Sequence, residues 1–115
     1  MAGKWDQVRK VVAARDVYCV RCLREATDVH HRKVKGIGGT SNDEVAYGLA
    51  NLILLCRACH SYVHANPREA YDTGYLVHSW DKPEMMGVIR KDHRILTFRS
   101  DGTFEQTEVC EFLPG

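Results

Sequence analysis

Apolar residues along this chain recur first at helical spacing and later at strand spacing. Near the N-terminus the pattern predicts an amphipathic helix over residues 4–14, because four apolar side chains fall on one face of such a helix. These side chains are Trp5, Val8, Val11 and Val12. The β-branched run at residues 16–20 ends this periodicity, so we expect the helix to stop before it and to pack on the core.

The middle of the chain predicts a turn, a strand, a loop, an apolar segment and a helix. In order, these are a tight turn at 18–23, a short strand at 29–34, a glycine-containing loop at 36–43, an apolar segment at 51–55 and a helix at 57–65. Asn66-Pro67 ends the helix, because the residue before a proline disfavours the helical conformation. A further helical turn is expected at 67–71.

After Gly74 the pattern favours a β-hairpin. Strands are expected at 88–89 and 94–99, with a turn at Asp101-Gly102, and Leu96 and Phe98 alternate with polar neighbours. Three other residues of this region are expected to be structural or on the surface: His78, His93 and Trp80, the last a core or docking aromatic rather than a platform for stacking bases. The sequence predicts one α+β domain, made of an N-terminal helix (1–18), a central core (19–66) and a C-terminal extension (67–115).

Composition limits the cellular compartments and the classes of protein that we expect. The 115-residue chain is 44% hydrophobic, which is enough for a modest core. It shows no apolar secretory segment and no run of about 20 apolar residues that would cross a bilayer, so we expect a cytoplasmic protein with no membrane partner. In that reducing setting, its cysteines are expected to bind metal or do redox chemistry. Cys110 has no pair in the pattern and is expected to be a buried, inert thiol.

The small net charge of +1 conceals an uneven distribution. Residues 1–35 carry nine Lys and Arg against four Asp and Glu, whereas residues 67–115 carry six against nine. The basic side chains of the first segment can form a local phosphate-binding face, or they can be part of a solvated surface of mixed charge. They are Lys4, Arg9, Lys10, Arg15, Arg21, Arg24, Arg32, Lys33 and Lys35.

Two CxxC pairs, Cys19/Cys22 and Cys56/Cys59, indicate a structural zinc site. Each CxxC turn supplies two thiolates, and four thiolates complete a tetrahedral zinc at about 2.3 Å. The 33 residues between the pairs exceed the zinc-ribbon gap of about 15–20, so the metal would join two distant segments. The alternative, a thioredoxin-like redox site, needs only one pair within a βαβ pattern.

Histidines between and after these pairs indicate a second metal site. His60 and His64 lie four residues apart on the expected helix and can share a metal. His30 and His31 point to opposite sides of a strand, so one can be a ligand while the other addresses a substrate. An alternative is a two-cysteine, two-histidine finger made of Cys19, Cys22, His60 and His64. Its gap of 37 residues far exceeds the ~12 of that module, and it would leave Cys56 and Cys59 without a role.

These residues form one motif: Cys19-Val-Arg-Cys22, Asp28-Val-His-His-Arg32, a Gly-Gly loop, the run from Asn51 to His60, and His64. The motif resembles that of the HNH endonuclease family, in particular the small zinc-containing HNH proteins of tailed bacteriophages. The resemblance covers residues 19–66 and includes the nine-residue step from Asn51 to His60. It implies a ββα-metal fold, in which two short antiparallel strands and a helix hold a divalent cation. The tail after Gly74 resembles the C-terminal extension of some phage members.

The resemblance implies a role for each motif residue. His31 matches the general base, His30 and His60 match ligands of the catalytic cation, and Asn51 matches the residue that braces the loop carrying the base. His64 matches a further ligand of histidine-rich members. Other branches have aspartate where His30 stands and asparagine where His60 stands. The imidazoles here favour Mn²⁺, Co²⁺, Ni²⁺ or Zn²⁺ over Mg²⁺, which prefers oxygen ligands.

The activity that these roles imply is metal-dependent hydrolysis of DNA phosphodiester bonds, by nicking or with weak sequence specificity. His31, as a neutral imidazole, would take a proton from the attacking water, and the cation would offset the developing negative charge. Arg32, Lys33 and Lys35 would contact the DNA phosphates. The resemblance to phage members also implies terminase or other packaging proteins as partners. A monomer or weak dimer is expected, because one ββα unit cuts one strand.

Two other classes of function stay open. A zinc-stabilised nucleic-acid-binding module without catalysis would be expected to lack the histidine at position 31 or the HxxxH ligands, and both are present. A structural adaptor in a larger assembly would use the acidic tail at 101–111 to dock on a basic partner. Docking of this kind is compatible with catalysis.

Overall fold

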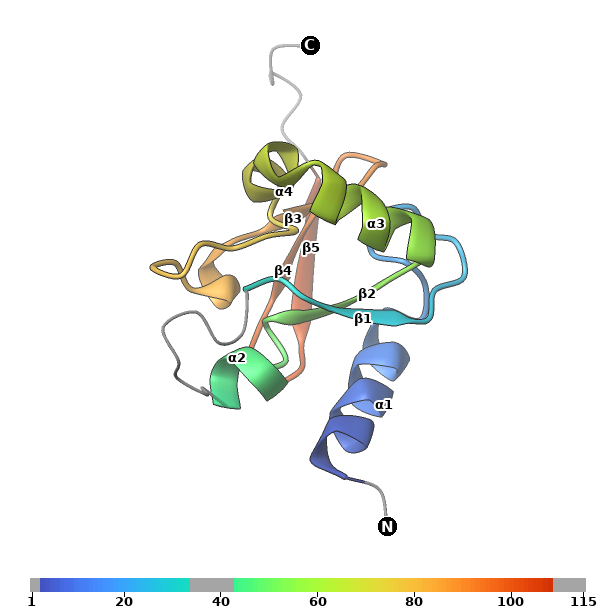
Figure 1. Ribbon diagram of the computed structural model, residues 1–115, viewed down its shortest axis with the longest axis vertical. Helices are drawn as coiled ribbons and strands as arrows, with labels where there is room; N and C mark the ends of the chain where they lie inside the picture. The colour runs from blue at the N-terminus through green and yellow to red at the C-terminus, as the bar shows by residue number, and fades with distance from the viewer. Residues whose placement is uncertain (1–2, 34–42, 109–115) are drawn as a thin grey trace.

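The computed structural model describes residues 3–33 and 43–108. Its elements are α1 (Lys4–Asp16), β1 (Asp28–His31), α2 (Asp43–Tyr47), β2 (Leu52–Leu55), α3 (Arg57–Ala65), α4 (Pro67–Thr73), the 3₁₀ helix η1 (Pro83–Met85), β3 (Val88–Ile89), β4 (Arg94–Phe98) and β5 (Phe104–Glu108). Figure 1 shows β1 and β2 between α1 on one side and α3 on the other. This mixture of helices and small antiparallel sheets confirms the expected α+β class.

The pairing of β1 with β2 organises the centre of the fold. The two strands are antiparallel, and His30 lies opposite Ile53 while His31 lies opposite Leu52. Because successive side chains of a strand point to opposite faces, one face of this sheet carries His30 and the other carries His31. The strand pairing therefore separates the two histidines as the sequence predicts.

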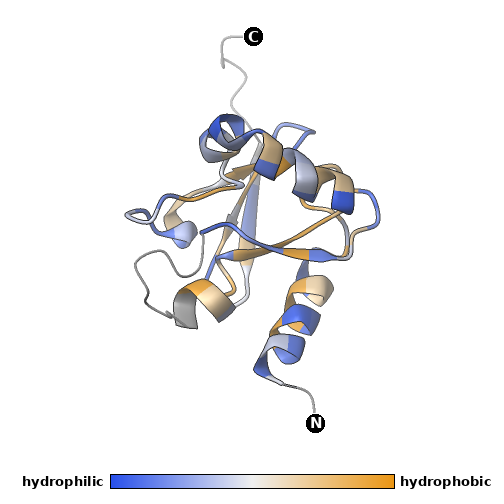
Figure 2. Cartoon of the chain, in the orientation of Figure 1, coloured by the Kyte–Doolittle hydropathy of each residue, from blue (hydrophilic) through white to orange (hydrophobic). Residues whose placement is uncertain are grey.

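β2 is buried along its whole length because both of its faces are covered. Leu52 and Leu54 pack with Val12 of α1 in one hydrophobic cluster. Ile53 and Leu55 belong to a second cluster, which includes Val63 of α3 and Leu96 and Phe98 of β4. Burial on both faces explains why β2 is a continuous run of leucine and isoleucine, seen as an orange strand in Figure 2.

The N-terminal helix α1 packs on the face of β2 opposite to α3. On α1, Val12 is buried and Trp5 and Val8 pack against the same cluster, whereas Val11 is 47% exposed. The predicted apolar stripe therefore covers the core with three of its four side chains. The helix continues two residues beyond the expected end and stops at Val17, which has a φ of 65°.

The C-terminal region forms a three-stranded antiparallel sheet in the order β3-β4-β5. Leu96 and Phe98 of β4 are buried, as their alternation with polar neighbours predicts. The expected strands at 88–89 and 94–99 correspond to β3 and β4, and β5 pairs with β4 after the expected turn. This sheet approaches the rest of the molecule closely at Gly74, where α4 ends with a φ of 88°. A Cβ atom at this position would lie 2.0 Å from the carbonyl oxygen of Gly87, so only glycine fits there.

The remaining elements agree with the sequence to different degrees. α3 has the bounds that the sequence predicts, and α4 extends the expected turn by two residues. The predicted loop at 36–43 lies almost wholly outside the described residues, and the short helix α2 was not expected. Within residues 3–33 and 43–108, no helix has both the length and the apolar character that crossing a bilayer requires.

Arg32, which directly follows β1, is fully buried, with no exposed surface. Its guanidinium donates hydrogen bonds to four backbone carbonyls, those of Ala50, Gly74, Pro83 and Met86. Burial lowers the pKa of Arg32 to about 10, so the group stays charged at neutral pH. The prediction that Arg32 contacts DNA phosphates is therefore wrong. The hydrogen bonds of its guanidinium instead join the end of β1 to three segments that are distant in the sequence.

We expect Arg32→Ala to lower the free energy of unfolding by about 3 kcal/mol or more, because several buried carbonyls would lose their donor. Arg32→Lys should also destabilise the protein, since one ammonium cannot reproduce the planar fork of a guanidinium. Urea unfolding followed by circular dichroism measures both effects. A midpoint unchanged in Arg32→Ala would contradict this structural role.

Candidate active site and metal centres

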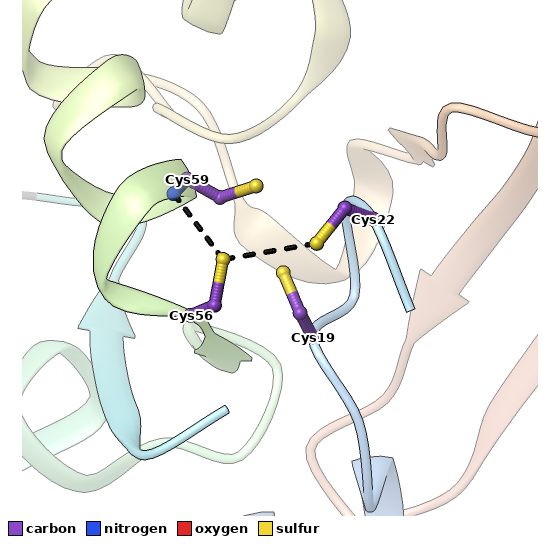
Figure 3. Close-up of side chains that lie close together, drawn as sticks. All are labelled: Cys19, Cys22, Cys56 and Cys59. Carbon is purple, nitrogen blue, oxygen red and sulfur yellow. Dashed lines mark hydrogen bonds between the residues drawn. The ribbon is translucent and has the colours of Figure 1, made fainter. Parts of the chain in front are cut away.

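Four thiols gather where the turn after α1 meets the start of α3. Cys19 and Cys22 lie in a turn that the Leu23 N–H closes by donating to the Cys19 carbonyl at 2.8 Å. A hydrogen bond from the Val20 N–H to the Leu54 carbonyl, at 2.9 Å, holds this turn beside β2. Cys56 is the N-cap of α3, and Cys59 lies one turn later. Figure 3 shows the four side chains pointing toward a common centre, and their sulfurs lie within 4.8 Å of one another.

This geometry fits a tetrahedral zinc. With zinc–sulfur bonds of about 2.3 Å, the sulfurs of a tetrahedral site are about 3.8 Å apart. The Cys22 and Cys56 sulfurs are 3.7 Å apart, whereas a disulfide requires about 2.05 Å. The four thiols can thus make up a complete, closed ligand set, whereas the alternative redox site would use only one of the two pairs.

Local contacts favour the thiolate form at Cys56, whereas burial raises the pKa of the Cys19 and Cys59 thiols. Burial alone would raise the pKa of the Cys56 thiol, but hydrogen bonds from the Cys59 backbone N–H and from neighbouring thiols lower it to about 7. Arg21 donates to the Cys59 sulfur at 3.4 Å and places a positive charge beside it. Because four thiolates and one zinc carry a net negative charge, this guanidinium offsets part of it.

A second cluster consists of three imidazoles from β1 and α3. His30, His60 and His64 present ligand atoms within 4.8 Å of one another, and their ring centroids lie 5.0 to 5.3 Å apart. Their exposure is graded, since His30 is buried, His60 is half-buried and His64 is exposed. Three ligands with one exposed side can hold a cation that keeps positions for water or substrate. The ligand set predicted from the sequence is thus brought together.

Hydrogen bonds determine which nitrogen of each ring faces the cluster. His30 donates from Nε2 to the Tyr75 carbonyl at 2.7 Å, and burial lowers its pKa to about 4. The ring is therefore neutral at pH 7, and Nδ1 carries the lone pair that can bind a metal. His60 has the opposite arrangement, because its Nδ1 donates to Asp28 Oδ2 at 3.0 Å and leaves Nε2 as the ligand.

Asp28 is a site residue for which the sequence analysis gave no role. It lies two residues before His30, on the same face of β1, and its carboxylate also pairs with the Arg57 guanidinium at 2.8 Å. The hydrogen bond from His60, together with Arg57, holds the pKa of the Asp28 carboxyl below its usual range. Carboxylates in this position orient metal-binding imidazoles and raise their basicity. The two-residue spacing from His30 was a signal that could have identified Asp28.

His31 lies on the other face of β1, toward α1 and α2. Its Nε2 donates to the Ala46 carbonyl of α2 at 3.1 Å, so in the neutral ring Nδ1 is the basic nitrogen. Trp5 of α1 stacks on the ring with a centroid distance of 5.2 Å and an interplanar angle of 11°. The sequence analysis placed Trp5 only in an apolar stripe, and it missed this contact because nothing in the local pattern relates α1 to β1.

Asn51 holds the segment that follows His31. Its Oδ1 accepts from the Lys33 N–H at 2.7 Å, and its Nδ2 donates to the carbonyls of Lys33 and Val45, at 3.2 and 2.8 Å. The side chain is buried and joins the end of β1 to α2, the helix that also contacts His31. Asn51 is therefore placed to act as a positioning residue.

Three arginines of the N-terminal segment are directed into the protein rather than toward a common surface. Arg15 is buried, pairs with Asp16 and donates to the carbonyls of Leu49 and Leu52. Arg21 contacts the thiol cluster and its side chain is 14% exposed, so Arg15, Arg21 and Arg32 do not contribute to the phosphate-binding face that was one of the two alternatives. Lys33 is half-buried, and its Nζ donates to the Asp81 carbonyl at 2.9 Å. Lys35 and Cys110 lie outside the described residues.

One known family matches the segment that carries both clusters. Residues 19–66 match the family model for HNH endonucleases. No curated protein and no solved structure matches the chain. The matched segment includes the seven potential metal ligands found among the described residues, together with Asp28, His31 and Asn51. The match confirms the resemblance to HNH endonucleases and implies nuclease activity, DNA as substrate and the use of a divalent metal.

We expect Cys56→Ser to lose bound zinc and much of the folded structure, because a structural zinc site contributes folding free energy directly. Atomic absorption and thermal melting measure the two effects. Cys110→Ser is the matched control, since four thiols already complete the tetrahedral set. Retention of zinc and of the wild-type melting temperature in Cys56→Ser would contradict the proposed ligand set.

We expect Asp28→Asn to weaken cation binding at the imidazole cluster by about 10- to 100-fold, because His60 would lose the carboxylate that orients it. Titration calorimetry with Mn²⁺ on zinc-loaded protein measures this affinity. Arg57→Gln is the control, since it removes a different partner of Asp28 and leaves the carboxylate on His60. Equal affinities in wild type and Asp28→Asn would show that this contact does not support the site.

Proposed function

We propose that this protein is a metal-dependent DNA endonuclease with a ββα-metal active site formed by β1, β2 and α3. The observation that carries the proposal is the arrangement of the two adjacent histidines of β1. His30 faces the imidazole cluster, and His31 is held on the other face with its basic nitrogen defined. Within the described residues, β1 pairs only with β2. In this proposal the scissile phosphate lies along the other edge of β1, between the exposed side of the imidazole cluster and His31.

His31 is the proposed general base. With Nε2 donating to the Ala46 carbonyl, Nδ1 accepts the proton as water attacks phosphorus. The imidazolium formed is stabilised by the same carbonyl, which keeps its hydrogen bond throughout. Trp5 stacks on the ring and limits its rotation, so the lone pair keeps its direction.

His30, His60 and His64 are the proposed ligands of a divalent cation, for which the imidazoles favour Mn²⁺, Co²⁺, Ni²⁺ or Zn²⁺ over Mg²⁺. When bound, such a cation supplies Lewis-acid stabilisation of the charge that develops on the phosphate and on the leaving oxygen. The protein determines the position of the cation, because the Tyr75 carbonyl and the Asp28 carboxylate orient two of the three imidazole rings. The exposure of His64 leaves the cluster accessible to a phosphate.

Asn51 and the thiol cluster have supporting roles in this proposal. Asn51 holds the backbone after His31 and so positions the base without touching the substrate. The zinc proposed between the four cysteines fixes the start of α3, from which His60 and His64 project. Lys33, and Lys35 in the segment beyond it, are proposed to contact phosphates, which gives affinity with little sequence preference.

The resemblance of the motif to small phage HNH proteins also supports a place beside DNA-packaging proteins such as terminase. Nicking of one strand by a monomer is the simplest activity of one such unit, and a weak dimer would cut both strands. A non-catalytic nucleic-acid-binding module is the alternative, and it would bind DNA without cleaving it in any divalent cation.

We expect His31→Ala to reduce plasmid nicking by at least about 100-fold, the lower range for loss of a general base. The assay compares supercoiled and relaxed plasmid over time in Mn²⁺, Mg²⁺, Ni²⁺, Co²⁺ and Zn²⁺. Zinc content and the melting temperature should stay close to wild type, because His31 binds neither proposed metal.

The matched control for this variant is His93→Asn. His93 is an exposed histidine in the turn before β4 with a φ of 67°, a conformation that asparagine tolerates. It should nick plasmid at the wild-type rate. Wild-type nicking by His31→Ala would remove His31 from its role, and absence of nicking by the wild type in every cation would favour the non-catalytic alternative.

A further inference from the structure

Trp80 is the most exposed large hydrophobic side chain among the described residues, with 76% of its surface accessible. It lies in a turn that the Asp81 N–H closes by donating to the His78 carbonyl at 3.0 Å. From the sequence, a core or docking aromatic was expected at this position rather than a platform for stacking bases. The exposure rules out a place in the core.

Trp80 is the outer ring of a three-ring stack. Its ring is parallel to that of His78, with a centroid distance of 4.5 Å and an interplanar angle of 5°. The other face of His78 stacks on Tyr71 of α4, at 3.9 Å and 2°. The two inner rings support the indole from below, so its orientation is defined although most of its surface is in solvent.

The stack lies beside the end of β1 that carries the proposed base. The Val77 N–H donates to the Arg32 carbonyl at 2.8 Å, and the Lys33 ammonium donates to the Asp81 carbonyl at 2.9 Å. The loop from residue 74 to η1 is therefore attached to the two residues that follow His31. Figure 1 shows this loop, in yellow and orange, beside the end of β1.

Two features favour a nucleobase as the partner of this ring. A base that leaves its duplex stack presents a flat π-surface, and stacking on an aromatic side chain contributes about 1–3 kcal/mol per base with little dependence on sequence. Ammonium groups lie near the indole within a segment of mixed charge, since Lys82 follows it on an exposed position between Asp81 and Glu84, and Lys33 is attached to the same turn. Ammonium groups beside an aromatic platform suit a chain of bases and phosphates better than they suit an apolar protein surface.

We propose that Trp80 stacks on an unpaired base of the DNA strand close to the scissile phosphate. The nuclease would then prefer single-stranded or locally opened DNA at the cut, and Trp80 would select for it. This inference rests on the proposed function for the identity of the substrate. Stacking itself requires no cleavage, so it can be tested in protein that does not cut.

The test measures binding of a labelled short oligothymidylate to zinc-loaded His31→Ala protein by fluorescence anisotropy. A strand of the same length made of abasic residues provides the same phosphates without bases. We expect addition of Trp80→Ala to raise Kd for oligothymidylate at least about fivefold, which corresponds to ~1 kcal/mol for one stacked base. Affinity for the abasic strand should not change. Trp80→Phe should recover part of the loss, because it restores an aromatic face.

Met85→Ala is the matched control, since Met85 is an equally exposed apolar side chain, 75% accessible, in the neighbouring η1. It should leave both affinities unchanged. The slope of log Kd against log salt should be the same with and without Trp80, because an indole neutralises no phosphate.

Three results would overturn the inference. One is an unchanged affinity for oligothymidylate in Trp80→Ala. The others are an equal loss on the abasic strand and an equal loss in Met85→Ala. These results are independent of the plasmid assay. Loss of nicking in His31→Ala can stand without base stacking, and base stacking can stand in a protein that never cuts.

Discussion

Burial of β2 on both faces is the constraint on which the rest of this structure depends. Its four apolar side chains alternate between the cluster shared with α1 and the cluster shared with α3 and β4. The antiparallel partner strand therefore has a fixed register, because a slip by one residue would exchange the faces of every side chain. That register places Asp28 and His30 toward α3 and His31 toward α1. Two neighbouring histidines thus acquire different surroundings from one packing requirement.

The two clusters of potential metal ligands differ in how far they are closed. Four thiols can fill a tetrahedral coordination sphere, and two of them are buried, so the site suits a permanent structural ion. The three imidazoles leave coordination positions empty and end in an exposed side chain. Both clusters take ligands from the first two turns of α3, with Cys56 at its N-cap and His60 and His64 beyond. A single short helix therefore carries ligands of the proposed structural metal at its start and ligands of the proposed catalytic cation further along.

Much of this arrangement could be predicted from the sequence because it is local. The bounds of α3, the alternation in β4 and the grouping of the cysteines and histidines follow from spacing and periodicity. Contacts between distant segments could not be predicted in this way. Arginine usually lies on the surface. The burial of Arg32 depends on carbonyls contributed by three later parts of the chain. The ring contacts of Trp5 and Trp80 likewise depend on how α1 and the loop after α4 meet the end of β1.

The hydrogen bonds of Arg32 have a consequence for where the functional unit ends. Residues 19–66 carry the HNH match, yet the residue directly after the proposed base is anchored on oxygen atoms at positions 74, 83 and 86. The recognisable motif is therefore not a portable module in this protein. A fragment trimmed to the motif would leave the Arg32 guanidinium, in the residue next to His31, with the Ala50 carbonyl as the one remaining of its four acceptors.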